Sequence, residues 1–279
     1  MLKKFSTKTE LQQYLNGERA AGKKIGLVPT MGALHAGHLS LIGIAQQQCD
    51  VVVCSIFVNP TQFNDPKDLE KYPRPITSDI EKLEATGCDI LFNPEVNEMY
   101  AGHENWHLNI GQLENLLEGA ARPGHYQGVT QVVSKLFNIV NPNVAFFGQK
   151  DYQQFLVISK MVELLSMQVK LVMCPIQREA DGLAMSSRNV HLSASDHRHA
   201  LVLSQTLNSV KENYVSDNIT GLKETAEQII EAEPDVELSY FEIADAETLL
   251  PAAPETRHVI ALVAAKVGST RLIDNIIIR

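Results

Sequence analysis

Two histidines stand three residues apart in Pro29–His38, which reads PTMGALHAGH. This segment joins an expected strand, 24–30, to an expected helix, 39–49, and such a junction presents backbone N–H groups and a helix dipole to an anion. Gly32 and Gly37 let the backbone approach a ligand closely. His35 and His38 are therefore expected to donate hydrogen bonds to a bound phosphate chain, where such bonds strengthen as charge builds on phosphorus.

Two other interpretations of this pair stay open. The rings could be solvated or satisfied by packing, or they could bind a metal ion. A zinc-protease helix needs HExxH and a third ligand, whereas no glutamate stands between these histidines. Phosphate binding is the interpretation that the spacing favours.

A second candidate segment, GQKD (148–151), follows the apolar run NVAFF (143–147) and opens the next expected helix. Lys150 can neutralise phosphate, and Asp151 can either reach a nucleotide sugar or cap the helix. Gln154 lies one turn further on and is expected to face the same crevice. A lone GxKD is weak evidence for a binding site. Because HAGH is present in the same chain, we favour the interpretation that GQKD binds phosphate.

Three more loops carry polar residues suited to binding. FVNPTQF (57–63) follows an expected strand, so Asn59 and Gln62 can project amides that donate and accept without adding charge, although an Asn-Pro turn has a structural use of its own. MSSRN (185–189) is a hydroxyl-rich loop with one fixed cation, Arg188. ARPGHYQGV (121–129) offers Arg122 to an acid or a phosphate.

The elements that position these loops alternate regularly. Expected strands at 24–30, 50–59, 88–94, 143–149 and 168–176 are separated by expected helices at 39–49, 77–87, 128–141 and 151–166. This order predicts an α/β fold, a Rossmann-like doubly wound parallel sheet with ligands at the carboxyl ends of its strands. Beyond residue 178 two helices precede three strands, which predicts a smaller C-terminal α+β domain. We expect domains at 1–177 and 178–279.

Composition limits the function classes. The 279 residues carry a formal net charge of -9 without basic runs, which argues against nucleic-acid binding. No stretch approaches the roughly 20 apolar residues of a membrane span, and no signal peptide is evident, so we expect a cytoplasmic protein without a membrane partner. The four cysteines lack metal-site spacing and are expected to be reduced and structural.

HAGH resembles the HxGH signature of a nucleotidyltransferase superfamily that includes class I aminoacyl-tRNA synthetases. Together with FVNPTQF, ARPGHYQGV, GQKDYQQ and DGLAMSSRN in order, the region 25–189 resembles the pantothenate synthetase family. The resemblance implies an enzyme, a ligase that condenses (R)-pantoate with β-alanine through a pantoyl adenylate and releases pantothenate, AMP and pyrophosphate. It also implies Mg²⁺ as the cofactor of ATP, and a homodimer.

The resemblance assigns roles residue by residue. The catalytic set is His35, His38, Lys150 and Arg188, and the pantoate and β-alanine set is Asn59, Gln62, Arg122 and Gln154. The ATP-binding set is Met31, Gly32, Ala33, Leu34, His35, Ala36, Gly37, His38, Gly148, Gln149, Lys150, Asp151, Gln177, Met185, Ser186, Ser187 and Arg188. The MSSR loop resembles a mobile loop that closes over the triphosphate.

Three positions depart from the family pattern. Gln149 stands where GEKD is usual, and Gln177 stands where an aliphatic residue or Thr is common, so Gln177 would reach adenine through its backbone. Asp79 stands alone where a pair of acidic residues is expected. The protein ligands of a metal ion are therefore left unassigned.

Three alternatives remain at this point. An adenylyltransferase of the same fold would keep the nucleotide on its product. A tRNA synthetase would need a basic anticodon-binding region, which this acidic chain lacks. A nucleotide-binding module that has lost its chemistry would not need both histidines, Lys150 and Arg188.

Overall fold

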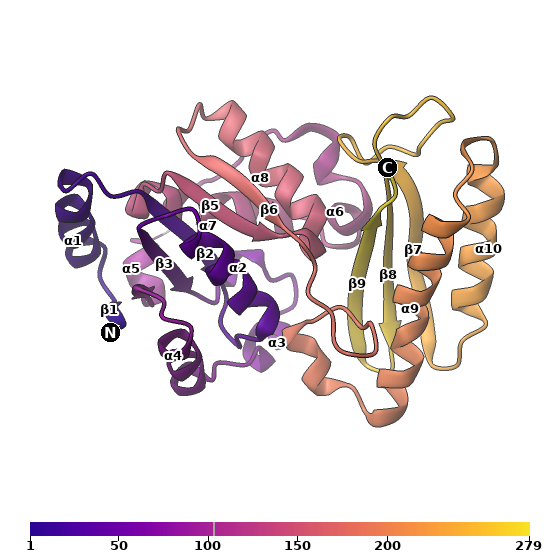
Figure 1. Cartoon of the computed structure of the whole chain (residues 1–279), viewed down its shortest axis with the longest axis horizontal. Coiled ribbons are helices and arrows are strands. Elements are labelled where there is room, and N and C mark those ends of the chain that lie inside the picture. Colours follow the sequence, from indigo (N-terminus) through magenta and orange to yellow (C-terminus); the bar gives the residue numbers. More distant parts are fainter. Residues whose placement is uncertain (103) are drawn as a thin grey trace. The chain divides into compact units, whose positions relative to one another are not determined.

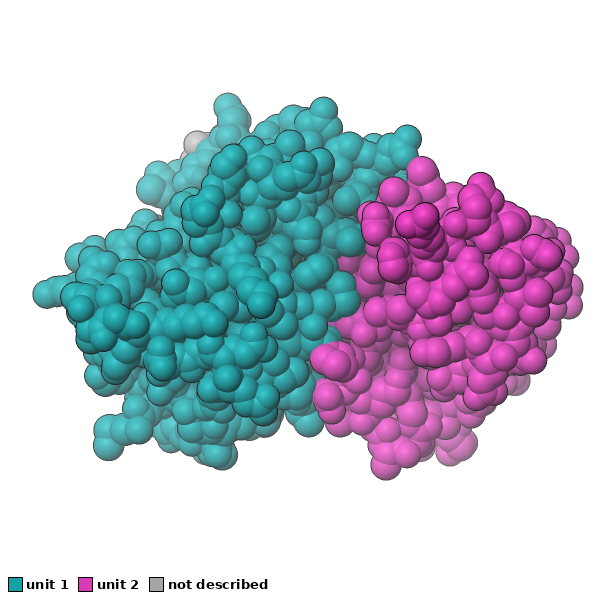
Figure 2. Space-filling view, turned by 45° about the horizontal axis from the view of Figure 1, so that its top comes forward, with its two compact units in different colours: residues 1–148, 153–174 teal, residues 149–152, 175–279 magenta. Residues whose placement is uncertain are grey.

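The structure is a computed structural model that describes residues 1–102 and 104–279. The chain divides into two compact units, coloured separately in Figure 2. Unit 1 comprises Met1–Gly148 and Gln153–Cys174, and unit 2 comprises Gln149–Tyr152 and Pro175–Arg279. The boundary expected between residues 177 and 178 stays a prediction for independently folding domains.

Unit 1 is built on a six-stranded sheet in the order β1-β4-β3-β2-β5-β6 (Figure 1). Every pairing in it is parallel. The strands are β1 (Lys3–Phe5), β2 (Ile25–Thr30), β3 (Val51–Ile56), β4 (Ile90–Phe92), β5 (Val144–Gly148) and β6 (Lys170–Cys174). The order reverses direction between β2 and β5, which is where open α/β sheets bind ligands.

Helices cover both faces of this sheet, and β3 shows why. Its six residues are all buried, but Val51 and Val53 join one hydrophobic core while Val52 and Cys54 join another. The first core contains buried residues of α1 (Lys8–Ala20), α7 (His125–Val140) and α8 (Tyr152–Leu164), and the second contains residues of α2 (Ala36–Gln46) and α4 (Ile76–Ala85). A strand that is apolar on both sides needs cover on both sides, so the expected doubly wound α/β fold is confirmed.

Some elements of unit 1 differ from the sequence-based expectation. Helix α2 begins at Ala36 rather than at Leu39, which places His38 in its first turn. Strand β1 and helix α1 were not expected, although Thr7 and Glu10 have the spacing of a helix cap and Thr7 Oγ1 does accept from the Glu10 N–H. Short helical segments also occupy the loops: η1 (Pro60–Gln62), α3 (Pro66–Lys71), α5 (Val96–Met99), η2 (Gly111–Glu114) and α6 (Leu117–Ala121).

Unit 2 packs two helices on an antiparallel sheet in the order β7-β8-β9. The strands are β7 (Val236–Asp245), β8 (Val259–Val267) and β9 (Thr270–Ile277). The helices are α9 (Ala194–Glu212) and α10 (Ile219–Glu231), and short turns of helix lie at η3 (Gln149–Asp151), η4 (Ser187–His191) and η5 (Ser216–Asn218). Leu203 and Leu207 of α9 share a core with Val263 of β8. The expected smaller α+β architecture is confirmed.

Candidate active site

The turn between β2 and α2 holds both histidine rings through backbone bonds. His35 is the N-cap of α2, and its Nδ1 accepts from the Gly37 N–H at 3.2 Å. Nδ1 of His38 accepts from the His35 N–H at 3.4 Å, and the ring centroids lie 4.1 Å apart. A neutral imidazole whose Nδ1 accepts carries its proton on Nε2. The local backbone thus gives both rings an Nε2–H donor, which is the atom needed to bind a phosphate oxygen.

Asp79 of α4 fastens the turn that leads to these histidines. Its side chain is 1% exposed, and its two oxygens accept from the backbone N–H groups of Ala33, at 2.8 Å, and Leu34, at 2.7 Å. Ala33 has a left-handed backbone with φ of 49°, which costs about 1–2 kcal/mol for an L-residue. Gly32 has φ of +82°, and a Cβ there would lie 3.1 Å from Asp79 Oδ2. The buried carboxylate therefore stabilises a strained turn.

The 57–63 loop meets the same turn within unit 1. The Gln62 amide is oriented at both ends, because its Oε1 accepts from Asn59 Nδ2 at 3.2 Å and its Nε2 contacts Met31 Sδ at 2.9 Å. Asn59 is 1% exposed and Gln62 8%. Tyr100 OH donates to Asn59 Oδ1 at 2.7 Å. The residue expected to bind pantoate thus directly contacts Met31, a residue of the expected phosphate-binding turn.

The segment that leads into α7, residues 122–125, supports Gln62 from its backbone side. The Gln62 carbonyl can only accept, so the 2.8 Å contact with His125 Nδ1 means that this nitrogen carries the ring proton. The His125 Nε2 atom can then accept from Arg122, 3.2 Å away. Arg122 also donates to the Gln62 carbonyl at 3.4 Å. His125 is therefore one of the residues that fix the Gln62 backbone.

The backbone of α7 passes close to the 57–63 loop at Gly128. The Gly128 carbonyl accepts from Asn59 Nδ2 at 3.1 Å. A Cβ at this position would lie 2.3 Å from the Thr61 carbonyl oxygen, which is backbone and cannot swing aside. Glycine at 128 is therefore required by the close approach of the two segments.

Two adjacent glutamines at the start of α8 have different surroundings. Gln153 is 4% exposed and ties down the 113–118 segment: it donates to the carbonyls of Leu113 and Leu116 and accepts from the Glu118 N–H. Gln154 is only half-buried. Gln153 is therefore structural, while Gln154 keeps its place as a candidate for substrate binding.

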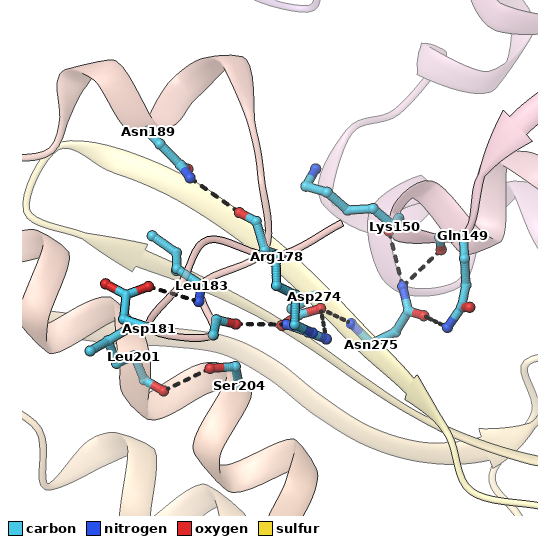
Figure 3. Close-up of polar contacts among 12 residues, drawn as sticks. Gln149, Lys150, Arg178, Asp181, Leu183, Asn189, Leu201, Ser204, Asp274 and Asn275 are labelled. Atoms are coloured by element: carbon cyan, nitrogen blue, oxygen red, sulfur yellow. Dashed lines mark hydrogen bonds and ion pairs between the residues drawn. The ribbon is translucent and has the colours of Figure 1, made fainter. Parts of the chain in front are cut away.

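In unit 2, the GQKD turn is fastened by one residue of β9. Asn275 Nδ2 donates to the carbonyls of Gln149 and Lys150, each at 3.0 Å, and Asn275 Oδ1 accepts from Gln149 Nε2 at 3.1 Å (Figure 3). The Lys150 side chain is 18% exposed, and its ammonium lies 4.0 Å from the carboxylate of Asp151. Gly148, the last residue of β5, belongs to unit 1.

The MSSR segment continues a short hairpin in unit 2. Met185 N–H donates to the Gln177 carbonyl at 2.9 Å, and Arg178 bridges to Ala184. Ser186 caps η4 by accepting from the Arg188 N–H at 3.2 Å. Asn189 then closes the loop, donating to Glu179 Oε1 at 2.7 Å and to the Ala184 carbonyl at 3.1 Å. Loop and hairpin therefore form one hydrogen-bonded structure.

Carboxylate side chains among the described residues are the natural candidates for metal ligands. Asp79 directs both oxygens at backbone N–H groups, so it holds the turn. One group, Glu179, Asp181 and His197, has ligand atoms within 4.8 Å of one another. There His197 Nε2 and Asp181 Oδ2 lie 2.7 Å apart, the distance of a hydrogen bond, and this bond lowers the pKa of Asp181. The group is satisfied as a hydrogen-bonded cluster.

The buried cysteines lie in surroundings that disfavour the reactive thiolate form. All four are free thiols, and burial raises the pKa of Cys88 to about 11 and that of Cys174 to about 11. Burial also raises the pKa of Cys54 well above its ordinary value. Thiols with such values stay protonated near neutral pH and are poor nucleophiles. The prediction that the cysteines are reduced is consistent with these surroundings.

The sequence-predicted residues thus fall into two groups. Unit 1 brings together the Met31–His38 turn, Asn59, Gln62 and Arg122, and unit 2 contains Gln149–Asp151 and the hairpin with Gln177 and Met185–Arg188. Binding of one nucleotide by both groups stays a prediction. Sequence reasoning missed Asp274 and Asn275, although two consecutive polar residues inside the apolar run RLIDNIII were a usable signal.

Comparison with known proteins agrees with this geometry. The family model described as pantoate-beta-alanine ligase matches residues 3–277. A pantothenate synthetase of Acetivibrio thermocellus is 44% identical over 277 residues, covering 98% of each chain, and that of Acidobacterium capsulatum is 47% identical over 95% of this chain and 89% of its own. Among the described residues, no helix combines the length and apolar character that a membrane crossing requires.

Solved structures give the same result. Pantothenate synthetase from Thermus thermophilus superposes with a TM-score of 0.93 at 41% identity, covering 100% of this chain and 99% of that one. The Francisella tularensis pantoate-beta-alanine ligase, solved with beta-gamma ATP and beta-alanine, gives 0.83 at 34% identity, covering 99% and 98%. With its parallel sheet, its HAGH turn and a family match over nearly its whole length, the chain belongs to the pantoate-β-alanine ligase family.

Proposed function

We propose that this chain carries out the reaction of its family, the ATP-dependent condensation of (R)-pantoate with β-alanine, with the residues identified above. In the first step a pantoate carboxylate oxygen attacks the α-phosphorus of ATP, and the bond to pyrophosphate breaks. In the second the β-alanine amine attacks the acyl carbon, loses a proton, and displaces AMP. Both substrates of the first step are anions, so the acidic chain must supply local donors and cations.

One contact gives the strongest support for the roles proposed for the residues of unit 1. Gln62 Nε2 lies 2.9 Å from Met31 Sδ, so the expected acid-binding loop adjoins the expected phosphate-binding turn. A carboxylate held by Gln62 and a triphosphate held by His35 and His38 would then be neighbours. Holding two reactants side by side removes much of the entropic barrier of a bimolecular step.

The roles of the remaining residues follow from their chemistry. The Nε2–H groups of His35 and His38 donate to phosphate oxygens, and donors preorganised in this way stabilise charge that develops in the transition state. Lys150 and Arg188, in unit 2, supply positive charge to the phosphates. Asn59, Gln62, Arg122 and Gln154 bind pantoate or β-alanine. The substrate carboxylate is itself the nucleophile, so the reaction requires no nucleophilic side chain of the protein.

Mg²⁺ belongs to this proposal as a component of MgATP. Asp79, the acidic residue at the expected place, directs both oxygens at backbone N–H groups. Asp151, the acidic residue of the GQKD turn, is 51% exposed and lies beside Lys150. The ion would therefore arrive on the phosphate oxygens and neutralise part of their charge. We also propose a cytoplasmic location, from the composition, and a homodimer, from the family resemblance.

Exchange of labelled pyrophosphate into ATP tests the adenylation step. The exchange should depend on (R)-pantoate and should need no β-alanine, whereas AMP release should need both. Retention of the nucleotide on the product would indicate an adenylyltransferase. Nucleotide binding without pantoate-dependent exchange would indicate a binding module, and either result would refute the proposal.

Single substitutions test the individual assignments. Alanine at His38 or Lys150 should slow adenylation by about 10²–10³-fold, because each removes a contact to the reacting phosphates. Near wild-type single-turnover rates in both variants would refute that assignment. Alanine at Gln62 or Gln154 should weaken pantoate binding more than ATP binding, so equal effects on the two ligands would contradict the pantoate assignment.

A further inference from the structure

Two consecutive polar residues of β9 are buried where the strand pattern calls for only one. The burial along β9 alternates from Thr270 to Asp274, as expected for a strand with one covered face, but Asn275 is buried as well. Asp274 is 4% exposed and Asn275 is 2% exposed. Burying a charge and an amide is costly unless both are fully paired, so their partners identify their role.

The Asn275 side-chain amide bonds to the GQKD turn. Its amide makes three hydrogen bonds, two from Nδ2 to the carbonyls of Gln149 and Lys150 and one to Oδ1 from Gln149 Nε2. Two of the three go to the backbone, so they fix the course of the chain on which the Lys150 side chain is carried. An apolar strand residue at this position could make none of these three bonds.

Asp274 is paired with the hairpin that leads to the MSSR loop. Its two oxygens accept from the two terminal nitrogens of Arg178 at 2.7 and 3.1 Å, a bidentate pair (Figure 3). The same guanidinium donates to the Gly182 carbonyl at 3.1 Å, across the hairpin turn. Arg178 therefore ties β9 to the base of the hairpin whose second strand continues into Ser186–Arg188.

The two anchors are coupled to each other. Asp274 Oδ1 accepts from the Asn275 N–H at 2.8 Å, so a shift of one side chain disturbs the other. Burial raises the pKa of Asp274, and the positive charges of Arg178 and Lys150 oppose this rise. The Asp274 carboxylate thus interacts electrostatically both with Lys150 of the GQKD turn and with Arg178 of the hairpin.

We propose that Asp274 and Asn275 are positioning residues for adenylation, which hold the Lys150 turn and the Arg178 hairpin in a fixed arrangement within unit 2. This inference rests on the proposed function. A displacement of about 1 Å can lower a rate by roughly 100-fold, so loss of either anchor should reduce catalysis without removing any group that contacts substrate.

The experiment compares Asn275→Ala and Asp274→Asn with Ser204→Ala. Ser204 is a matched control in the same unit: it is 3% exposed, and its hydroxyl donates to the Leu201 carbonyl at 3.2 Å. The kcat of pyrophosphate exchange, measured below the unfolding temperature of every variant, should fall about 10–100-fold in the two β9 variants, with KM for pantoate changed much less. The control should match wild type. Asn275→Ser, which keeps one polar atom, serves if Asn275→Ala does not fold.

A second readout does not depend on activity. Limited acylation of lysines, followed by mass spectrometry, gives the reactivity of Lys150 relative to Lys266, which is 53% exposed in the same unit. This ratio should rise about threefold or more when the turn is released, and it should stay constant in Ser204→Ala. Wild-type kcat in the folded β9 variants would overturn the inference. If the wild type shows no pyrophosphate exchange at all, the proposed function fails. In that case the acylation ratio still tests the positioning role, and a ratio that is the same in the β9 variants as in wild type would overturn it.

Discussion

Removal of the Asp79 carboxylate should release the turn that carries the two histidines. The carboxylate is 1% exposed and accepts from two backbone N–H groups, at 2.8 Å from Ala33 and 2.7 Å from Leu34. A hydrogen bond to a charged group contributes about 1.5–3 kcal/mol, so Asp79→Ala should cost roughly 3–6 kcal/mol of unfolding free energy. Asp79→Asn keeps one acceptor and should cost about half as much.

The strain at Ala33 provides an independent check of this argument. Its φ of 49° costs about 1–2 kcal/mol, which the Asp79 bonds help to offset. Glycine adopts this conformation without strain, so Ala33→Gly introduced into the Asp79→Asn variant should restore about 1 kcal/mol. Urea unfolding monitored by circular dichroism gives these free energies, and pyrophosphate exchange at low urea should fall at least about tenfold in Asp79→Ala.

Asp89 offers the matched control for Asp79. It also accepts from a backbone N–H, that of Val52 at 2.8 Å, but it is exposed and lies just before β4, at the amino ends of the strands. Asp89→Asn should cost about 1 kcal/mol and leave the exchange rate unchanged. An Asp79→Ala variant that unfolds within about 1 kcal/mol of wild type and retains its exchange rate would refute the reasoning.

Three further predictions concern packing, thiols and pH. Gly128→Ala should destabilise the chain by about 2 kcal/mol or more and weaken pantoate binding, measured by calorimetry, because the added Cβ would overlap the Thr61 carbonyl. In the native protein at about pH 8, iodoacetamide should label the half-buried Cys49 before the buried Cys54, Cys88 and Cys174. Burial raises the pKa of Cys49 too, but its thiol is more accessible to the reagent. Mass spectrometry gives the order of labelling. The bond from His197 lowers the pKa of Asp181, so its ionised form stabilises the fold above the ordinary carboxyl pKa of about 4, and this contribution is lost as pH falls through the folded pKa. Asp181→Asn should therefore lower Tm by about 1–3 °C at about pH 7, and the difference should shrink as pH falls through the folded pKa.

Each of these has its own control or contrary outcome. Gly43 lies in the interior of α2, where an added Cβ would meet open space, so Gly43→Ala should stabilise by about 0.5–1 kcal/mol, and equal effects at Gly43 and Gly128 would contradict the packing argument. Equal labelling of all four cysteines in folded protein would contradict the burial argument. A Tm difference for Asp181→Asn that grows toward low pH would have the wrong sign for a lowered pKa.

The sequence alone determined the larger architecture and the chemistry of the loops. Strands apolar on both faces, such as Val51–Ile56, alternate with helices, and that pattern admits few folds. The histidine turn could also be predicted from the sequence, because the ligand-binding character of a strand-to-helix junction depends on residues that are adjacent in the sequence. Short elements such as β1, with three residues, carry too little periodicity to be found this way.

Only the tertiary structure decided which polar residues hold the site in place. Asp79 lies 46 positions from Ala33, and Asn275 lies 125 positions from Lys150, so no local pattern links these pairs. The structural role of a buried carboxylate or amide depends on the backbone groups with which it forms hydrogen bonds. Those partners are brought to it only when distant segments of the chain pack together. Local sequence therefore specified the groups that face substrate, whereas the fold specified the groups that position them.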